Sequence, residues 1–315
     1  MTAIPPTLPA PGLPFADRAP WLPYITLVIA MMIYALAVIV ARYVHADIPP
    51  AGLTFWRFFA AFVILLPFVY RQCIRQWAAT RQMWRHIVAI AIIQSVIGQV
   101  AFYIGVQTTT ATNAGLIVAI QPALVICFAF MLLGDTMTRR QGIGLVLAIS
   151  GAIAIITRGD FAVLRELNLV VGDFWILLSI LCWGYYSILV RQCSAVMSPL
   201  VIFETMCFVS FVGLIPVYGA EMLFWDLYVS FDVLTVSAVL FFAVFASIFA
   251  LTFMMYGIAT IGPGRTAVFS YLIPPFTAIA AYFLLGEKFK NYHLVGMILV
   301  LLGVYLATRR RAAAG

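Results

Sequence analysis

Ten apolar stretches, joined by short polar segments, run through almost the whole chain. A helix that crosses a bilayer needs about 20 predominantly apolar residues, and the stretches reach or approach that length. They lie at 22–44, 50–70, 86–107, 113–133, 139–157, 172–193, 199–219, 234–258, 264–285 and 291–308. The pattern predicts an all-α polytopic membrane protein of ten transmembrane helices, with no soluble domain of any size.

The chain contains an internal duplication. The pattern Pro-x9-Leu-Leu-Gly-acid-x8-Gly-x6-Gly begins at Pro122 and again at Pro274, 152 residues later. Nearer the N-terminus the halves align with a shift of 149, which places Pro50 on Pro199. Each copy holds five spans, and an odd number forces the second copy to cross the membrane in the opposite sense. Inverted repeats of this kind are typical of secondary transporters.

The duplication and the composition together predict the organisation of the chain. Of the 315 residues, 65% are hydrophobic and 9% are charged, whereas an average soluble domain has roughly 25% charged residues. Residues 1–20 are rich in proline and lack the charged start and apolar run of a cleavable signal, so we expect a disordered cytoplasmic tail. Residues 21–158 and 172–310 are expected to form the first and the second, inverted, five-helix repeat.

The net charge of +7 is explained by topology. With the N-terminus inside, one side of the membrane holds twelve basic residues and the other five. The twelve are Arg18, Arg71, Arg75, Arg81, Arg85, Arg139, Arg140, Arg191, Arg265, Arg309, Arg310 and Arg311. Because basic residues accumulate in cytoplasmic loops, we expect both termini in the cytoplasm. Because topology accounts for the positive net charge, a nucleic-acid partner is not needed to explain it.

Two segments carry a resemblance to a known family. Span 4–5 reads AGLIVAIQPALVICFAFMLLGD followed by QGIGLVLAISGA, and span 9–10 reads RTAVFSYLIPPFTAIAAYFLLGE followed by HLVGMILVLLGV. Both resemble the EamA repeats of the drug/metabolite transporter superfamily, as does the internal arginine of helix 2 in LTFWRFFAAF. The aromatic content most resembles YddG-type exporters of aromatic and other amino acids, although Tyr34-Ala35 replaces the Trp-Gly pair seen at Trp183-Gly184.

The resemblance implies a transporter, and not an enzyme, that moves small molecules by alternating access through a central cavity between the repeats. It further implies a multi-pass protein of the bacterial inner membrane whose partners are a small-molecule substrate, an amino acid or similar metabolite, and the lipid bilayer. We expect no cofactor, no metal and no nucleic-acid partner, and a monomer or a weak homo-oligomer.

Two prolines near the middle of spans are the first candidates for function. Pro122 and Pro274 each remove a backbone donor and free the carbonyls near Val118 and Ser270. A free carbonyl at bilayer depth must face protein or a cavity. We interpret the two kinks as hinges that also shape the substrate cavity.

Uncharged polar and aromatic side chains near the midplane are the candidate substrate-binding residues. They provide donors for a carboxylate and acceptors for an ammonium group without a fixed buried charge, and aromatic rings provide apolar area. The set comprises Tyr34, Gln94, Ser95, Gln99, Tyr103, Gln121, Trp183, Tyr186, Ser247, Ser270 and Tyr271.

Two charged residues lie within spans, where ionisable groups are functional candidates by default. Glu204, on helix 7, is a candidate proton-coupling carboxylate, and we expect its side chain to snorkel to the interface. Arg57, on helix 2, is interpreted as a structural residue that holds the external end. Inversion places them near opposite faces of the membrane.

Several alternatives remain at this stage. The same fold would also suit export of drugs, cations or other metabolites. An intramembrane enzyme is disfavoured because His45, His86 and His293 form no HExxH pattern and no GxSxG motif occurs. A passive channel is disfavoured because kinked, duplicated helices suit moving gates.

Overall fold

The computed structural model describes residues 20–44, 49–160, 162, 169–226, 228–285 and 290–308. Ten helical segments in this part of the chain are long and apolar enough to cross a membrane, which confirms the predicted ten helices. The tail expected at residues 1–20 lies, apart from Pro20, outside the described residues, as do Gly286 and Glu287 of the second repeat signature.

Four of the ten spans combine several helical elements. The first two spans are α1 (Leu22–Val44) and α2 (Pro50–Arg75), and a short helix, α3 (Trp77–Gln82), follows. The third span combines α4 (Trp84–Ala91), a π-helical segment η1 (Ile92–Gln99) and α5 (Val100–Thr108). The fourth combines α6 (Ala111–Val118) and α7 (Gln121–Leu133), and the fifth is α8 (Arg139–Ile156).

The second half repeats this order. The sixth and seventh spans are α9 (Val171–Cys193) and α10 (Pro199–Trp225). The eighth combines α11 (Val233–Phe241), a second π-helical segment η3 (Phe242–Leu251) and α12 (Thr252–Ile261). The ninth combines α13 (Pro263–Val268), a 3₁₀ turn η4 (Phe269–Leu272) and α14 (Ile273–Leu285), and the tenth is α15 (Asn291–Thr308).

Two helices extend beyond the predicted apolar stretches. The structure continues α2 to Arg75 and α10 to Trp225, although the hydrophobic pattern placed their ends at residues 70 and 219. The added turns contain arginine, glutamine and glutamate, which are strong helix formers. The backbone therefore stays helical beyond the predicted apolar stretches.

Helices α2 and α10 cap each other's N-termini. Glu221, near the end of α10, accepts hydrogen bonds of 2.9 to 3.1 Å from the backbone N–H groups of Ala51 and Gly52. Gln76, directly after α2, accepts a 2.8 Å bond from the N–H of Ser198, the N-cap of α10. The first N–H groups of a helix have no partner within it, so both contacts satisfy orphan donors. They also hold the two helices antiparallel.

Helices α8 and α15 pack backbone against backbone at glycines. A Cβ on Gly144 would lie 2.6 Å from the carbonyl oxygen of Gly303, and a Cβ on Gly151 would lie 2.5 Å from that of Gly296. Small residues allow this close approach of membrane helices. The early glycine of each helix meets the late glycine of the other, so α8 and α15 are also antiparallel.

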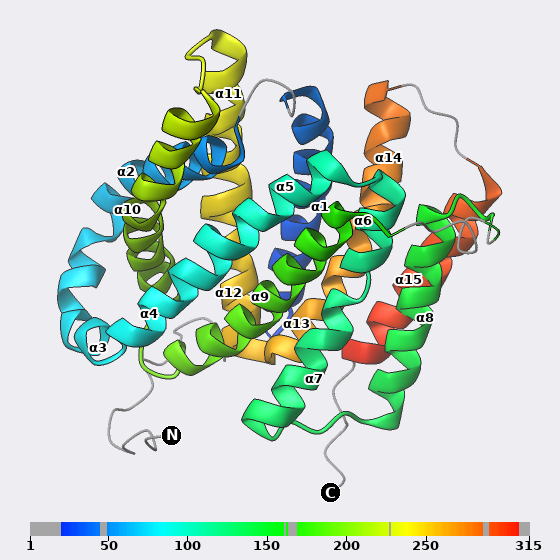
Figure 1. Ribbon diagram of the computed structural model, residues 1–315. Coiled ribbons are helices and arrows are strands. Elements are labelled where there is room, and N and C mark those ends of the chain that lie inside the picture. Colours follow the sequence, from blue (N-terminus) through cyan, green and yellow to red (C-terminus); the bar gives the residue numbers. More distant parts are fainter. Residues whose placement is uncertain are drawn as a thin grey trace, which may run out of the picture.

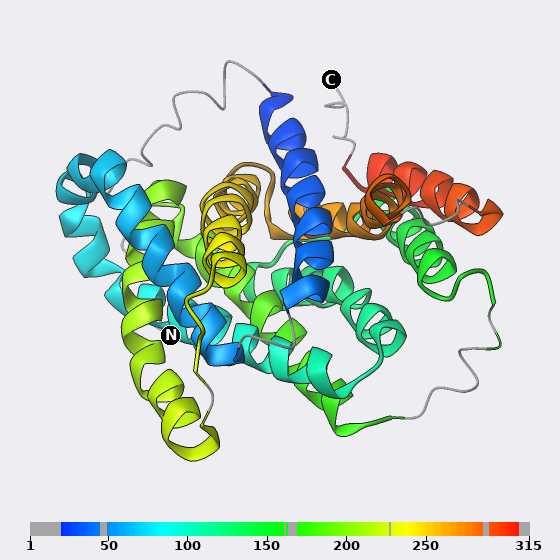
Figure 2. The same ribbon diagram turned by 90° about the horizontal axis from the view of Figure 1, so that it is seen from above.

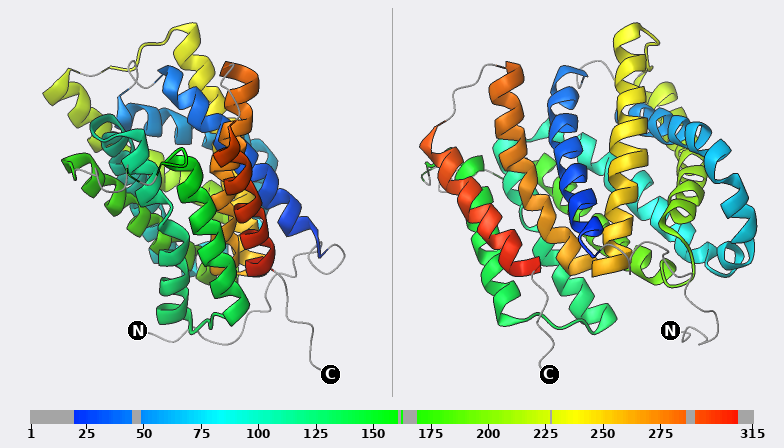
Figure 3. Two further views of the ribbon diagram at one scale, coloured as in Figure 1. Left: turned by 90° about the vertical axis from the view of Figure 1, so that its right-hand side faces the viewer. Right: turned by 180° about the vertical axis from the view of Figure 1, so that it is seen from behind.

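These two pairs lie at opposite ends of the molecule, α2 with α10 at one end and α8 with α15 at the other (Figures 1 and 2). Each pair joins equivalent helices of the two repeats in opposite directions, as the predicted inversion requires. The remaining spans fill the middle, where α1 lies between α12 and α14 (Figure 3).

The spans in the middle are irregular at matching places in both repeats. The fourth span breaks between Val118 and Gln121, just before Pro122, and the ninth passes through the 3₁₀ turn η4 just before Pro274. A missing backbone donor explains both irregularities. The π-helical segments of the third and eighth spans were not predicted, and π-helical turns within α-helices occur frequently at functional sites.

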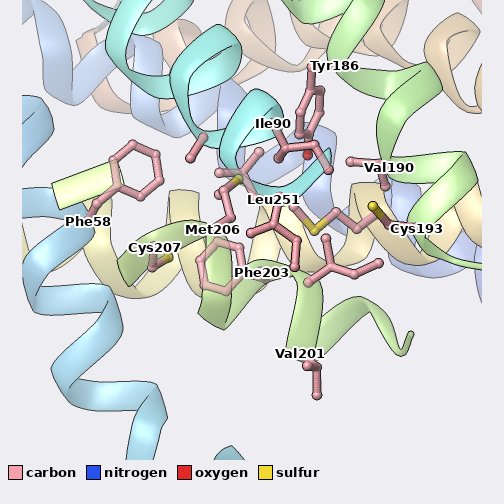
Figure 4. Packing of buried hydrophobic residues seen from close by; sticks show 14 of the residues in the cluster. Phe58, Ile90, Tyr186, Val190, Cys193, Val201, Phe203, Met206, Cys207 and Leu251 are labelled. Atoms are coloured by element: carbon pink, nitrogen blue, oxygen red, sulfur yellow. The ribbon is translucent and has the colours of Figure 1, made fainter. Parts of the chain in front are cut away.

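The largest hydrophobic cluster surrounds α10 and joins it to α2, α4, α9 and α12. Figure 4 shows part of this cluster, with Tyr186 directing its hydroxyl group into it beside Ile90. A second cluster, around α1, α8, α15 and η4, includes Tyr271. A third, smaller one lies between α1, α2, α11 and η3.

Candidate functional site

Arg57 of α2 reaches the middle of the eighth span. Its Nε donates a 2.5 Å hydrogen bond to Oγ of Ser247, and a terminal nitrogen lies 3.4 Å from the carbonyl oxygen of Ala246. Ser247 lies near the centre of the span Val233–Ile261. Because α2 belongs to the first half of the chain and η3 to the second, this contact joins the two repeats at mid-span depth.

The charge of Arg57 has no acidic partner in the described part of the chain. The side chain is only 4% exposed, and no described carboxylate oxygen lies within 4.0 Å of its nitrogens. A guanidinium has five N–H donors, and only two nitrogens of Arg57 bond to acceptors. We expected Arg57 to hold the external end of helix 2. The structure adds a feature that this role does not include: the permanent positive charge of Arg57 reaches the middle of the eighth span.

A related contact joins α10 to the first π-helical segment. Ser210 of α10 donates a 2.8 Å hydrogen bond to Oγ of Ser95, which in turn donates a 2.6 Å bond to the side-chain oxygen of Gln94. Ser95 and Ser247 are 152 residues apart, the shift of the repeat. Helix 2 thus contacts helix 8 and helix 7 contacts helix 3 through equivalent serines. Of these two contacts, only the one between helices 2 and 8 includes a charged residue, Arg57.

Aromatic side chains surround the Arg57 contact. Tyr34 and Tyr103 pack with Trp56 against the third hydrophobic cluster, which includes Ala246 and residues of α1, α2 and η3. The tertiary structure therefore places two of the predicted tyrosines, Tyr34 and Tyr103, against the cluster that includes Ala246, whose carbonyl oxygen contacts Arg57.

Several donors in this region have no hydrogen-bond partner among the described residues. They are the indole N–H groups of Trp56 and Trp183 and the hydroxyl group of Tyr186. Trp183 packs against Phe102, with ring centroids 5.1 Å apart. Gln99 is also buried. Unpaired buried donors are uncommon, and they leave this region able to bind a polar ligand.

The remaining predicted residues lie at the two proline kinks. The hydroxyl group of Tyr271 donates a 2.8 Å hydrogen bond to the carbonyl oxygen of Ala119, its equivalent 152 residues earlier. Tyr271 is buried, whereas Gln121 and Ser270 are half-buried. The predicted set therefore divides into a group on the central segments α1, η1, α5, α9 and η3, which includes Ser247, the partner of Arg57, and a group at the crossing of helices 4 and 9.

Loss of the Tyr271 hydroxyl group should destabilise the protein. We expect Tyr271→Phe to lower the free energy of unfolding by about 1 kcal/mol, since the freed Ala119 carbonyl gains no new partner. Tyr256→Phe is the matched control, because the Tyr256 hydroxyl is buried without a partner, and its loss should be neutral or stabilising. Thermal unfolding in detergent measures both. Equal melting temperatures for the two variants would contradict a structural role for the Tyr271 bond.

Glu204 does not snorkel. Its side chain is 2% exposed, and neither carboxylate oxygen has a hydrogen-bond partner among the described residues. The expectation that it reaches the interface was wrong, because neighbouring helices enclose the second turn of α10. Among the described residues, no group of three or more histidine, cysteine, aspartate or glutamate side chains is placed to hold a metal ion.

Comparison with known proteins agrees with this architecture. The model of the EamA-like transporter family matches the chain twice, at residues 21–157 and 170–309. A solved crystal structure superimposes with a TM-score of 0.75 at 16% sequence identity, over 92% of this chain and 96% of that one. At this identity the likeness shows the fold alone.

Curated relatives are named as transporters. The uncharacterized transporter YyaM of Bacillus subtilis is 28% identical over 272 residues, which cover 85% of this chain and 87% of that protein. A protein of Streptantibioticus cattleyicolor named as a probable terminal-alkyne amino-acid exporter is 26% identical over 203 residues, 64% of this chain and 65% of that protein. With its ten spans and its two family matches, the chain belongs to the EamA-like transporter family, whose members the resemblance places among drug/metabolite transporters.

Proposed function

We propose that this protein exports amino acids, including large and aromatic ones, by alternating access. The observation that carries the proposal is Arg57, a buried guanidinium without a described acidic partner, at a contact between the repeats. Binding sites of secondary transporters lie near the midplane, where repeats meet. The substrate carboxylate would provide the missing counter-charge and accept the remaining N–H donors of Arg57.

The residues around Arg57 suit the rest of an amino acid. Tyr34, Tyr103 and Trp183 offer aromatic surface for an apolar or aromatic side chain. The ammonium group needs acceptors, and the side-chain oxygens of Gln94 and Gln99 are uncharged acceptors of this kind. The name of the S. cattleyicolor relative, an amino-acid exporter, supports this class of substrate.

The duplication supports the transport mechanism. Rocking of one inverted repeat against the other would open the site to each side in turn. The breaks at Pro122 and Pro274 lie where the two central kinked helices cross, so we propose them as hinges. Gln121, Ser270 and Tyr271 would then line the moving crossing and contact substrate during part of the cycle.

The orientation follows from the distribution of charge. We propose a bacterial inner-membrane protein with both termini in the cytoplasm, because the basic residues concentrate on that side. The loop after helix 2 is rich in arginine, whereas the charged residues of the loop after helix 7 are all acidic. Inversion of the repeats produces this contrast.

Export of organic cations is the second candidate function. The observation that favours it is Glu204, a buried carboxylate without a described partner. A deep carboxylate suits a cation, but Glu204 packs among apolar residues at one end of α10, away from the mid-span group around Arg57. We therefore rank amino acids first.

Transport by purified protein tests the proposal. Liposomes loaded with L-phenylalanine, L-leucine, glycine, L-lysine, a sugar or an organic cation should release phenylalanine and leucine fastest. Protein-free liposomes provide the control. The proposal fails if no amino acid leaves faster than from protein-free liposomes, and preferential release of the organic cation would favour the second candidate.

A further inference from the structure

Glu204 is a buried acid that the proposed binding of substrate does not use. It lies in the second turn of α10, and both of its oxygens are buried without a partner in the described part of the chain. Its helix neighbours Val201, Phe203 and Cys207 belong to the largest hydrophobic cluster. No described basic nitrogen lies within 4.0 Å of the carboxylate.

The titratable groups around Glu204 offer it no counter-charge. Cys207 of the same helix and Cys73 of α2 interact with it electrostatically, and both are thiols. The other titratable groups on the helices packed against α10 are Arg57, Tyr70, Arg71 and Arg75 of α2, Arg85 and His86 of α4, and Tyr256 of α12. The side chains of Arg71, Arg75 and Arg85 are exposed.

An unpaired carboxylate is costly in this environment. Removal of an ionised carboxyl group from water without a partner favours its neutral form, and the cost is higher still in a protein that spans a membrane. In the conformation seen here, no described group is placed to stabilise an ionised Glu204 carboxylate. A residue that serves only packing would not need a titratable group, since glutamine or leucine would fill the same space.

We propose that Glu204 is the proton-binding site that couples export to the proton gradient. This proposal rests on the proposed transport function, and it identifies the proton as the ion that drives export. The step is one protonation: the O–H bond of the carboxyl group forms while the site is open to the acidic exterior and breaks while it is open to the cytoplasm. Each cycle moves one proton inward and one substrate outward, and no electron is transferred.

One packed cluster connects the surroundings of Glu204 to the substrate region. Cys207, one turn after Glu204 on α10, belongs to the same hydrophobic cluster as Tyr186 of α9 and Phe58, the neighbour of Arg57 on α2. Movement of α10 around Glu204 therefore changes the packing of groups proposed to bind substrate. Because the Glu204 side chain is only 2% exposed, proton exchange requires the helices packed against α10 to move. That requirement links protonation to the rocking of the repeats.

Two transport modes distinguish coupling from binding. In proteoliposomes we expect Glu204→Gln to reduce phenylalanine movement driven by a pH gradient by about tenfold or more. Exchange of labelled for unlabelled phenylalanine at equal pH needs no net proton movement and should remain within about twofold of wild type. Asp135→Asn, which neutralises an exposed acid, should behave as wild type in both modes. A gradient response retained in Glu204→Gln would overturn the proposal.

A measurement without substrate keeps this test independent of the proposed function. A carboxyl group protonated in the folded protein loses its stabilising effect as rising pH ionises it. The melting temperature of the wild type should therefore fall between about pH 5 and about pH 9 relative to that of Glu204→Gln. Groups that do not interact with Glu204 affect both proteins alike and cancel in the difference. Parallel profiles would overturn proton binding at Glu204, whereas absence of any amino-acid exchange would overturn the proposed function.

Discussion

Gly144→Leu should prevent stable assembly of the two repeats, with a loss of at least about 3 kcal/mol in the free energy of unfolding. A Cβ at this position would lie 2.6 Å from both the Gly303 carbonyl oxygen and the Ala307 backbone nitrogen. Both obstacles are backbone atoms of α15, which cannot turn away as a flexible side chain could. The helices would have to separate along a contact that depends on their close approach.

Gly142→Leu is the matched control for this prediction. Gly142 lies in the same helix, but a Cβ there would meet only the terminal carbon of Met137, at 3.6 Å. Thermal unfolding in detergent and the monodisperse fraction on size exclusion measure both variants. We expect a large loss for Gly144→Leu and little change for Gly142→Leu. If the two variants lose stability equally, the crossing of α8 and α15 does not depend on these glycines.

Arg57→Gln should reduce transport of L-phenylalanine by about 10- to 100-fold, the equivalent of a hydrogen bond to a charged group of about 1.5 to 3 kcal/mol. Glutamine retains a donor for Ser247 and removes the charge proposed to bind the substrate carboxylate. Arg57→Lys should be intermediate, because lysine keeps the charge but not the two-pronged donor geometry. Initial rates of exchange in proteoliposomes measure the effect.

A substrate without a carboxylate shows whether Arg57→Gln impairs substrate recognition or the protein structure. L-phenylalaninamide lacks the carboxylate, so its transport should be much less affected by Arg57→Gln than that of phenylalanine. Arg71→Gln, which changes an exposed arginine of the same helix, should leave both substrates unaffected. Equal losses for phenylalanine and its amide would mean that Arg57 only holds helix 2 against helix 8.

Much of the fold follows from local pattern. Ten spans were predictable because each must bury about 20 apolar residues in lipid, and the inversion because five is an odd number. The prolines located two of the irregularities, since a missing N–H breaks a helix wherever the chain later packs. The π-helical segments had no comparable signal. Residues 92–99 and 242–251 lie inside spans that read as continuous helix, and a shift in hydrogen-bond register leaves no mark in composition.

The candidate site was less predictable than the fold. Sequence reasoning selected Ser247 and Tyr34 as uncharged polar residues of central helices, and it recognised Arg57 only as a structural arginine. The sequence did carry a signal for Arg57, because a charged residue within a membrane span is costly and is a functional candidate by default. The sequence could not show the partner of Arg57, because Ser247 lies 190 residues away along the chain.

The sequence by itself determined that the chain spans a membrane ten times, that its halves are inverted copies, and which family it belongs to. These properties depend on hydrophobic length, charge distribution and repeated motifs, and each can be read along the chain. Only the tertiary structure decided which charges are unpaired. It joins Arg57 to Ser247 and encloses Glu204 among apolar side chains. The burial of a charged group and its pairing with a partner both depend on segments that are distant in sequence. Their contributions to the free energy therefore arise only when the helices pack.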